Sequence, residues 1–165
     1  MAAAATRACA SAVVGAPFGG VAIYSDGIRI TGLRFVEGVP PAAADDDVAA
    51  DAARQLRYYF VDPAFHFSFP LRVAGTPFQR RVWEAIAAIP CGSTRTYGDL
   101  ARELDAPARA VGQACGDNSL PIVIPCHRII GANGLGGFAH ATGGFPPAVK
   151  RWLLEHEGAL RGTLL

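Results

Sequence analysis

The sequence predicts an α+β protein, in which a small strand-rich N-terminal α/β subdomain precedes a mainly helical C-terminal domain with a helix-turn-helix. Apolar residues alternate with polar ones over residues 10–37, as is typical of short strands. In the second half of the chain, apolar residues recur at helical spacing. There, residues 93–106 and 107–118 form two short helical segments that are separated by a tight turn, which indicates a helix-turn-helix.

The N-terminal subdomain should contain several strands and one helix. An Asp-Gly pair at residues 26–27 lies between two alternating segments and predicts a hairpin. Residues 47–60 have apolar positions at helical spacing, so we expect a helix there. Residues 65–73 alternate again and predict a further strand.

The C-terminal domain should begin with a helix, because Thr76 is a typical N-cap and Pro77 fits the first helical position. We therefore divide the chain into residues 1–74 and 75–165. After the helix-turn-helix we expect a short buried strand, a glycine-rich loop and a final helix, over residues 120–125, 131–145 and 146–158.

Composition excludes several classes of protein. The 165 residues contain no apolar run of the roughly 20 that a membrane span needs, and the alanine-rich start lacks the apolar core of a signal peptide. Four scattered cysteines without a C-x-x-C pair argue against a disulfide framework and a zinc site, which favours a reducing cytoplasm. A net charge of +1 gives no strong signal for nucleic acid, so any such affinity needs a local patch.

The run Ile-Pro-Cys-His-Arg-Ile-Ile contains the strongest candidate for chemistry. Cys126 would attack as a thiolate, whose formation a neighbouring base or cation such as His127 or Arg128 favours by lowering the pKa. A buried structural cysteine beside a surface histidine is the ordinary alternative. Adjacent residues on an extended chain point apart, so a water would have to bridge the thiol and the imidazole. Asn118 either braces the turn that holds Cys126 or simply ends a helix.

Arg109 is the second candidate, at the start of the second helix of the helix-turn-helix. Small residues follow it, including Ala110 and Gly112, so this helix can approach a groove closely with one long cationic side chain protruding. A solvent-facing arginine is the alternative.

Four motifs together resemble those of the O6-alkylguanine-DNA alkyltransferases, also called methylated-DNA–protein-cysteine methyltransferases. The motifs are TYGDLA at 96–101, RAVGQACGDN at 109–118, PCHRII at 125–130 and KRWLLEHEG at 150–158. The resemblance covers residues 75–158 densely and in order, and residues 10–37 more loosely.

The resemblance implies direct DNA repair without a cofactor. An alkyl group on O6 of guanine, and also on O4 of thymine, would move irreversibly and once to Cys126. His127 would take the thiol proton through a water, and Glu157 would orient His127. Asn118 would hold the loop, and Tyr97 would press on the target phosphate and donate to the leaving base.

The partner implied by the resemblance is double-stranded DNA that contains O6-alkylguanine. The damaged base would be extruded, Arg109 would fill the vacated stack, and the second helix would lie in the minor groove. The expected DNA contacts are Arg95, Thr96, Arg109, Ala110, Gly112 and Arg128. The resemblance implies a monomer, with cooperative binding along the strand left open.

The base pocket would be lined by Pro121, Phe138 and Gly143. Phe138 stands where many family members have a tyrosine that helps to recognise the base. The loop at 135–145 is also longer, so His140, Thr142 or backbone amides would have to substitute for that hydroxyl. No metal is expected.

Three rival functions are weaker. A non-catalytic alkylation-damage-binding relative would lack the cysteine that this chain has. A cysteine hydrolase built on Cys126, His127 and Glu157 would leave Arg109 and the helix-turn-helix without a role. A transcription factor would need base-reading side chains on its recognition helix, where this chain has small ones.

Overall fold

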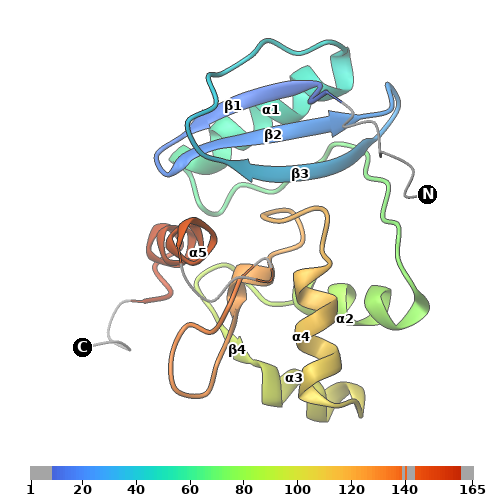
Figure 1. Ribbon diagram of the computed structural model, residues 1–165, viewed down its shortest axis with the longest axis vertical. Coiled ribbons are helices and arrows are strands. Elements are labelled where there is room, and N and C mark those ends of the chain that lie inside the picture. The colour runs from blue at the N-terminus through green and yellow to red at the C-terminus, as the bar shows by residue number, and fades with distance from the viewer. Residues whose placement is uncertain (1–8, 139, 141–143, 161–165) are drawn as a thin grey trace, which may run out of the picture.

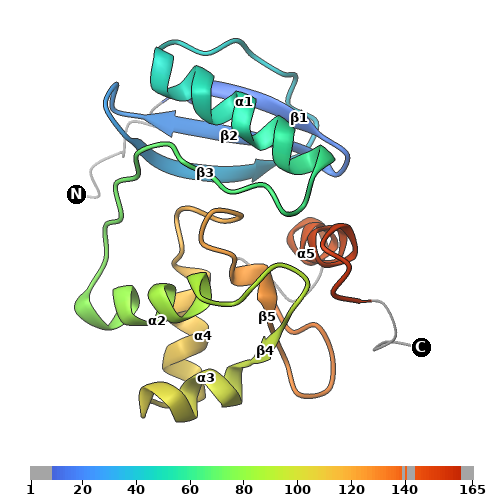
Figure 2. The same ribbon diagram turned by 180° about the vertical axis from the view of Figure 1, so that it is seen from behind.

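The computed structural model describes residues 9–138, 140 and 144–160, which form an upper strand-rich layer and a lower helical one (Figure 1). The upper layer is an antiparallel sheet in the order β1-β2-β3. Its strands are β1 (Ala12–Ala16), β2 (Gly19–Ser25) and β3 (Ile30–Val36). Helix α1 (Asp47–Val61) lies across one face of the sheet (Figure 2).

The predicted hairpin joins β2 to β3. The Asp26 carboxylate accepts hydrogen bonds from the backbone N–H groups of Ile28 and Arg29 at 2.9 and 2.7 Å, and Gly27 takes a positive φ of 89°. The predicted helix at 47–60 is also confirmed, with Asp46 as its N-cap.

The strand predicted at 65–73 is wrong. Only Leu71 forms an isolated bridge, to Ile30. The alternating phenylalanines of this segment instead pack on one another and on Tyr59 of α1, with the rings of Phe65 and Phe67, and of Tyr59 and Phe67, 5.7 and 5.5 Å apart. The period of two therefore reflects an aromatic face and not a paired strand.

The lower layer contains the expected helices. They are α2 (Pro77–Ala87), α3 (Tyr97–Leu104), α4 (Ala108–Gly116) and α5 (Phe145–His156). Thr76 caps α2 as predicted, and α3 and α4 form the helix-turn-helix, whose turn begins at Asp105 in the left-handed region. A short parallel pair, β4 (Arg95–Thr96) and β5 (Ile129–Ile130), was not expected.

The buried strand predicted at 120–125 is also wrong. The segment is mostly buried, but it forms a turn in which Ile122 has a φ of 73° and the backbone N–H of Ile124 donates to Leu120 O at 2.9 Å. A short apolar run has no periodicity that separates a strand from a buried turn. A 3₁₀ turn, η1 (Cys126–Arg128), follows directly, so Cys126 does not lie on an extended chain.

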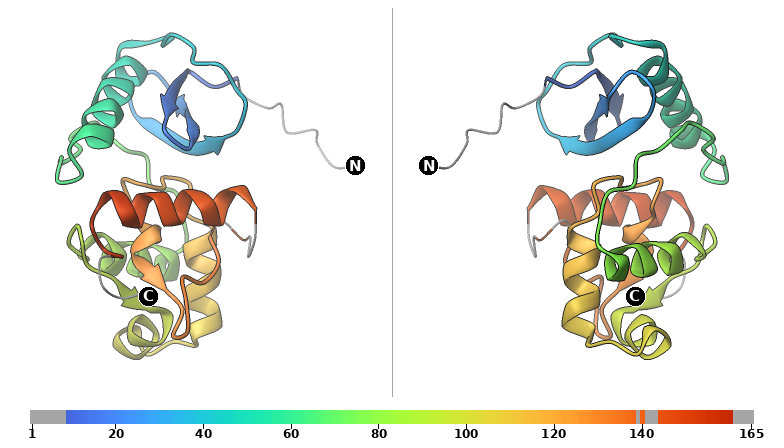
Figure 3. Two further views of the ribbon diagram at one scale, coloured as in Figure 1. Left: turned by 90° about the vertical axis from the view of Figure 1, so that its left-hand side faces the viewer. Right: turned by 90° about the vertical axis from the view of Figure 1, so that its right-hand side faces the viewer.

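Helix α5 lies between the sheet layer and the other helices (Figure 3). Aromatic contacts join the layers there: the rings of Phe18 and Trp152 are 5.3 Å apart, and those of Phe35 and Phe138 are 5.5 Å apart. No helix in the described part of the chain is long and apolar enough to cross a membrane.

Candidate active site

Cys126 begins η1 directly after Pro125 and is only 3% exposed. The Asn118 side chain lies where α4 has ended and binds three groups around the thiol. Its Nδ2 donates to Cys126 Sγ at 3.0 Å and to Ile124 O at 2.9 Å, while its Oδ1 accepts from Leu120 N at 2.9 Å. Asn118 thus connects the helix-turn-helix to the turn and to the sulfur.

The pKa of the Cys126 thiol is raised well above its ordinary value, first by a hydrogen bond with the Cys115 thiol and then by burial. The Asn118 amide and the Lys150 ammonium act in the opposite direction but do not outweigh these effects. The expectation of a lowered thiol pKa is therefore wrong for the free protein. The thiol is protonated at neutral pH, so any attack by this sulfur would need a base to take its proton.

His127 is fully buried, and its Nε2 lies 2.8 Å from Glu157 Oε1. Glu157 stays ionised at neutral pH, because its pKa is lowered to about 2; burial would raise the pKa, but hydrogen bonds from Arg128 and His127 outweigh burial. An ionised carboxylate requires a proton on Nε2. Nδ1 is then the basic nitrogen, and it has no hydrogen-bond partner among the described residues.

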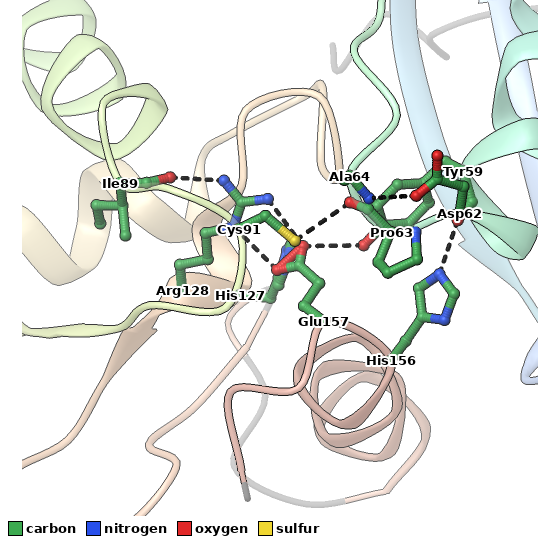
Figure 4. Close-up of polar contacts among 10 residues, drawn as sticks. All are labelled: Tyr59, Asp62, Pro63, Ala64, Ile89, Cys91, His127, Arg128, His156 and Glu157. Carbon is green, nitrogen blue, oxygen red and sulfur yellow. Dashed lines mark hydrogen bonds and ion pairs between the residues drawn. The ribbon is translucent and has the colours of Figure 1, made fainter.

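Arg128 was expected to contact DNA, but the structure uses its guanidinium internally (Figure 4). Its Nε and Nη2 donate to the two Glu157 oxygens at 2.9 and 2.8 Å, and Nη1 donates to Ile89 O at 2.6 Å. A guanidinium committed to three acceptors has little left for a phosphate. We therefore reassign Arg128 as the counter-ion of Glu157.

Lys150 is a residue of this site that sequence reasoning missed. Its Nζ is buried and donates to Ile129 O at 2.6 Å and to Gly137 O at 3.0 Å. Burial lowers the pKa of this ammonium to about 8. The signal was available: Lys150 shares a helix face with Leu153 and Leu154, both buried, and a lysine in such a row is unusual.

Tyr97 begins α3 close to the same ammonium, whose Nζ is 5.8 Å from the centre of the tyrosine ring. Its hydroxyl donates to Gly137 O over a long 3.5 Å. Burial, ahead of the nearby cysteines, raises the pKa of the phenol, so Tyr97 keeps its proton and can donate it.

The expected DNA contacts lie on α3, α4 and the segment before them. Arg109 is exposed in the first turn of α4, and its side chain makes no hydrogen bond or ion pair within the described ranges, while Ala110 and Gly112 are partly exposed. Arg95 pairs with Glu103. The Thr96 hydroxyl caps α3, accepting from Asp99 N at 3.0 Å.

Within its described residues, the structure does not bring all of the expected pocket residues together. Pro121 lies partly exposed in the turn before Cys126, whereas Phe138 is buried against Phe35 of β3. Gly143 and Thr142 lie outside the described residues, and His140 is paired with Asp117 at 3.0 Å. No group of three or more His, Cys, Asp or Glu in the described part of the chain is arranged to hold a metal ion.

Comparisons with known proteins identify relatives over most of the chain. The family model "6-O-methylguanine DNA methyltransferase, DNA binding domain" matches residues 77–159. A methylated-DNA–protein-cysteine methyltransferase of Methanosarcina acetivorans is 36% identical over 157 residues, which are 90% of this chain and 97% of that protein. The Salmonella typhimurium protein of the same name is 57% identical over 135 residues, 80% of this chain and 72% of its own length.

A similar solved structure is that of Mycobacterium tuberculosis OGT in complex with DNA. It has a TM-score of 0.75 and 39% sequence identity, and the match covers 89% of this chain and 91% of that one.

Proposed function

Since the chain belongs to the methylated-DNA–protein-cysteine methyltransferases, we propose that Cys126 is the sulfur that accepts the alkyl group. The chain is a DNA repair enzyme that transfers the methyl group of O6-methylguanine to a cysteine. One observation carries the choice of Cys126: this buried thiol accepts a hydrogen bond from Asn118 and precedes the histidine that Glu157 holds.

In the reaction we propose, Cys126 Sγ attacks the alkyl carbon, and the S–C bond forms as the C–O6 bond breaks. The electron pair of the broken bond stays on guanine, where the Tyr97 hydroxyl donates a hydrogen bond to the leaving base. His127 Nδ1 takes the thiol proton through a bridging water, and Glu157 stabilises the imidazolium that results. The thioether is stable, so the protein reacts once. The same attack applies to O4-alkylthymine.

DNA binding through the minor groove is part of the same proposal. A base inside a duplex cannot reach a buried thiol, so it must be flipped out. Helix α4 has small residues that permit close approach, and Arg109 is free of internal partners in the described ranges. The relative from Mycobacterium tuberculosis has been crystallised with DNA. Arg95 and Thr96 would serve the phosphates, with Arg95 exchanging Glu103 for the backbone.

Replacing Arg109 by alanine should slow repair of duplex DNA by about 10- to 100-fold, because nothing then fills the vacated stack and the few kcal/mol of unstacking are no longer offset. Single-stranded DNA with the same lesion has no stack to fill, so its repair should change far less. Single-turnover rates on both substrates measure this. Arg57→Ala, which removes an exposed charge from α1, is the control. Equal losses on both substrates would contradict the role.

Alkylation itself should destabilise the protein. The sulfur lies in a close-packed site, and overpacking by a methyl group costs about 1–3 kcal/mol. For a protein of this size the melting temperature should fall by roughly 2–12 °C. Scanning calorimetry of the free and the fully methylated protein measures the difference, and identical transitions would show that the site accommodates the methyl group without strain.

The function is tested by mixing the protein with excess duplex DNA that carries O6-methylguanine and measuring the intact mass. One methyl group on Cys126, with guanine restored and no second turnover, is the expected result. Lesion-selective binding without a mass gain would instead indicate a non-catalytic damage-binding protein. A methyl group mapped to exposed Cys9 would indicate adventitious alkylation.

Several broader statements belong to this proposal. A cytoplasmic location suits an enzyme whose reactive group must remain a free thiol, as all four cysteines are here. We expect a monomer on DNA, with cooperativity along the strand to be decided by titration. We also propose that the boundary between the N-terminal subdomain and the C-terminal domain lies between residues 74 and 75.

A further inference from the structure

We propose that Tyr59, from the N-terminal subdomain, is a positioning residue of alkyl transfer, because its hydroxyl holds the Glu157 carboxylate in place behind His127. This inference rests on the roles proposed above for Glu157 and His127. It gives the N-terminal layer a part in the chemistry, although the catalytic thiol and its base both lie in the other layer.

The Glu157 carboxylate accepts four hydrogen bonds from the described residues, two on each oxygen (Figure 4). Oε1 accepts from His127 and from Arg128 Nε. Oε2 accepts from Arg128 Nη2 at 2.8 Å and from the Tyr59 hydroxyl at 3.1 Å. The Tyr59 hydroxyl is therefore the neutral donor that fixes Oε2 on the side away from His127 and resists rotation of the carboxylate.

A second bond fastens the same end of α5 to Tyr59. His156 Nε2 donates to the Tyr59 carbonyl at 2.7 Å, and the two rings meet edge to face with centres 5.3 Å apart. Glu157 is the C-cap of α5, and helix ends lack intrahelical partners. Since Tyr59 is only 2% exposed, a rigid part of the N-terminal layer holds a position that would otherwise fray.

The other groups that face Glu157 determine how its charge reaches His127. Arg128 pairs with the carboxylate directly at 2.8 Å. Burial first, and then the Glu157 carboxylate and the Cys91 thiol, which donates to Pro63 O at 3.2 Å, raise the pKa of the Tyr59 phenol. The pKa of His127 is lowered first by burial and also by the charges of Arg128 and Lys150, and the Glu157 carboxylate opposes these effects. Loss of the Tyr59 donor leaves more charge on the carboxylate, so the pKa of His127 should rise and the imidazole should protonate at higher pH.

Tyr59→Phe removes the hydroxyl and keeps the ring. At saturating methylated duplex, the single-turnover rate should fall by about 3- to 10-fold, the fold-change that the loss of one hydrogen bond produces. The acid limb of the pH profile of this rate should move to higher pH. The affinity of the protein for DNA should not change. A merely structural role would lower the amount of active protein without moving the pH profile. Tyr58→Phe is the control, because that neighbouring side chain is 52% exposed and makes no hydrogen bond among the described residues.

The titration of the His127 imidazole, followed by NMR in DNA-free protein, tests the inference independently of activity. A higher pKa of His127 in Tyr59→Phe than in wild type supports it. If that variant does not fold, His156→Phe, which removes only the bond to the Tyr59 carbonyl, should show smaller changes in the same direction. An unchanged rate, pH profile and His127 titration overturn the inference, whereas a wild type that gains no methyl group overturns the proposed function itself.

Discussion

Replacing Cys126 by alanine should abolish alkyl transfer and leave both the fold and DNA binding in place. The change removes one sulfur atom from a buried position, which costs about 1 kcal/mol in packing. Asn118 loses the sulfur as an acceptor but keeps its bond to Ile124 O, so the turn before η1 remains tied. The loss of activity should therefore be complete, without a matching loss of folded protein.

The measurement is a time course of intact mass with excess methylated duplex, together with a titration of DNA binding. We expect no methyl group on the alanine variant and an affinity for methylated duplex within about 3-fold of wild type. Cys9→Ala is the matched control, because Cys9 is exposed and should not matter. A methyl group that appears on Cys115 in the Cys126→Ala variant would mean that the neighbouring thiol can act as acceptor.

The raised pKa of the Cys126 thiol depends first on Cys115. The hydrogen bond between the two thiols is the largest cause of the raised pKa of Cys126, ahead of burial. Nothing in the spacing of Cys115 and Cys126 predicted that contact, since Cys115 lies on α4 and a turn separates this helix from Cys126. The sequence suggested only a packing role for Cys115, whereas in the structure it is a neighbour of the proposed acceptor thiol.

Helices were predicted well from the sequence because their ends carry local signals. Thr76 and Pro77 specify the start of α2 through a capping box and a fixed φ, whatever the rest of the chain does. The hairpin at Asp26-Gly27 is equally local. Residues 120–125 and 65–73 were mispredicted as strands because their apolar patterns record burial and not pairing, and burial depends on distant segments.

The sequence predicted only those residues of the candidate site that belong to a recognisable motif. Asn118, Cys126, His127 and Glu157 belong to quoted motifs, and the structure brings them together. Arg128 was assigned to DNA because the sequence shows that a residue is cationic but does not show which group it pairs with. Tyr59 was missed because it lies 98 residues from Glu157, in a segment with no motif of its own.

Replacing Glu157 by glutamine should have the second largest effect, since it damages both the relay and the fold. An amide oxygen accepts fewer hydrogen bonds than a carboxylate, and the amide nitrogen would point hydrogens at existing donors. Arg128 and His127 would lose the charge that compensates them in a buried site. Breaking such a pair costs about 3–5 kcal/mol, which lowers the melting temperature by roughly 6–20 °C.

The rate of alkyl transfer by the folded variant should fall by about 10²- to 10³-fold. Without the carboxylate, nothing requires the proton of His127 to stay on Nε2, so Nδ1 no longer serves reliably as the base. The rate is best measured in single turnover at low temperature, where the variant is still folded. Glu155→Gln, on the same helix, is the control, because its side chain is 56% exposed and its only ion pair among the described residues is with Arg151 at 3.9 Å.

The stability difference between wild type and Glu157→Gln should also depend on pH in a defined direction. The pKa of Glu157 is lowered from 4.5 to about 2 in the folded protein, because the hydrogen bonds from Arg128 and His127 outweigh burial. A lowered folded-state pKa stabilises the protein fully above the unfolded value, and this stabilisation is lost as the pH falls through the folded value. Urea unfolding should therefore show a constant difference above about pH 5 that shrinks toward pH 2. A difference that stays the same across this range would show that Glu157 stabilises the fold through its shape and not through its charge.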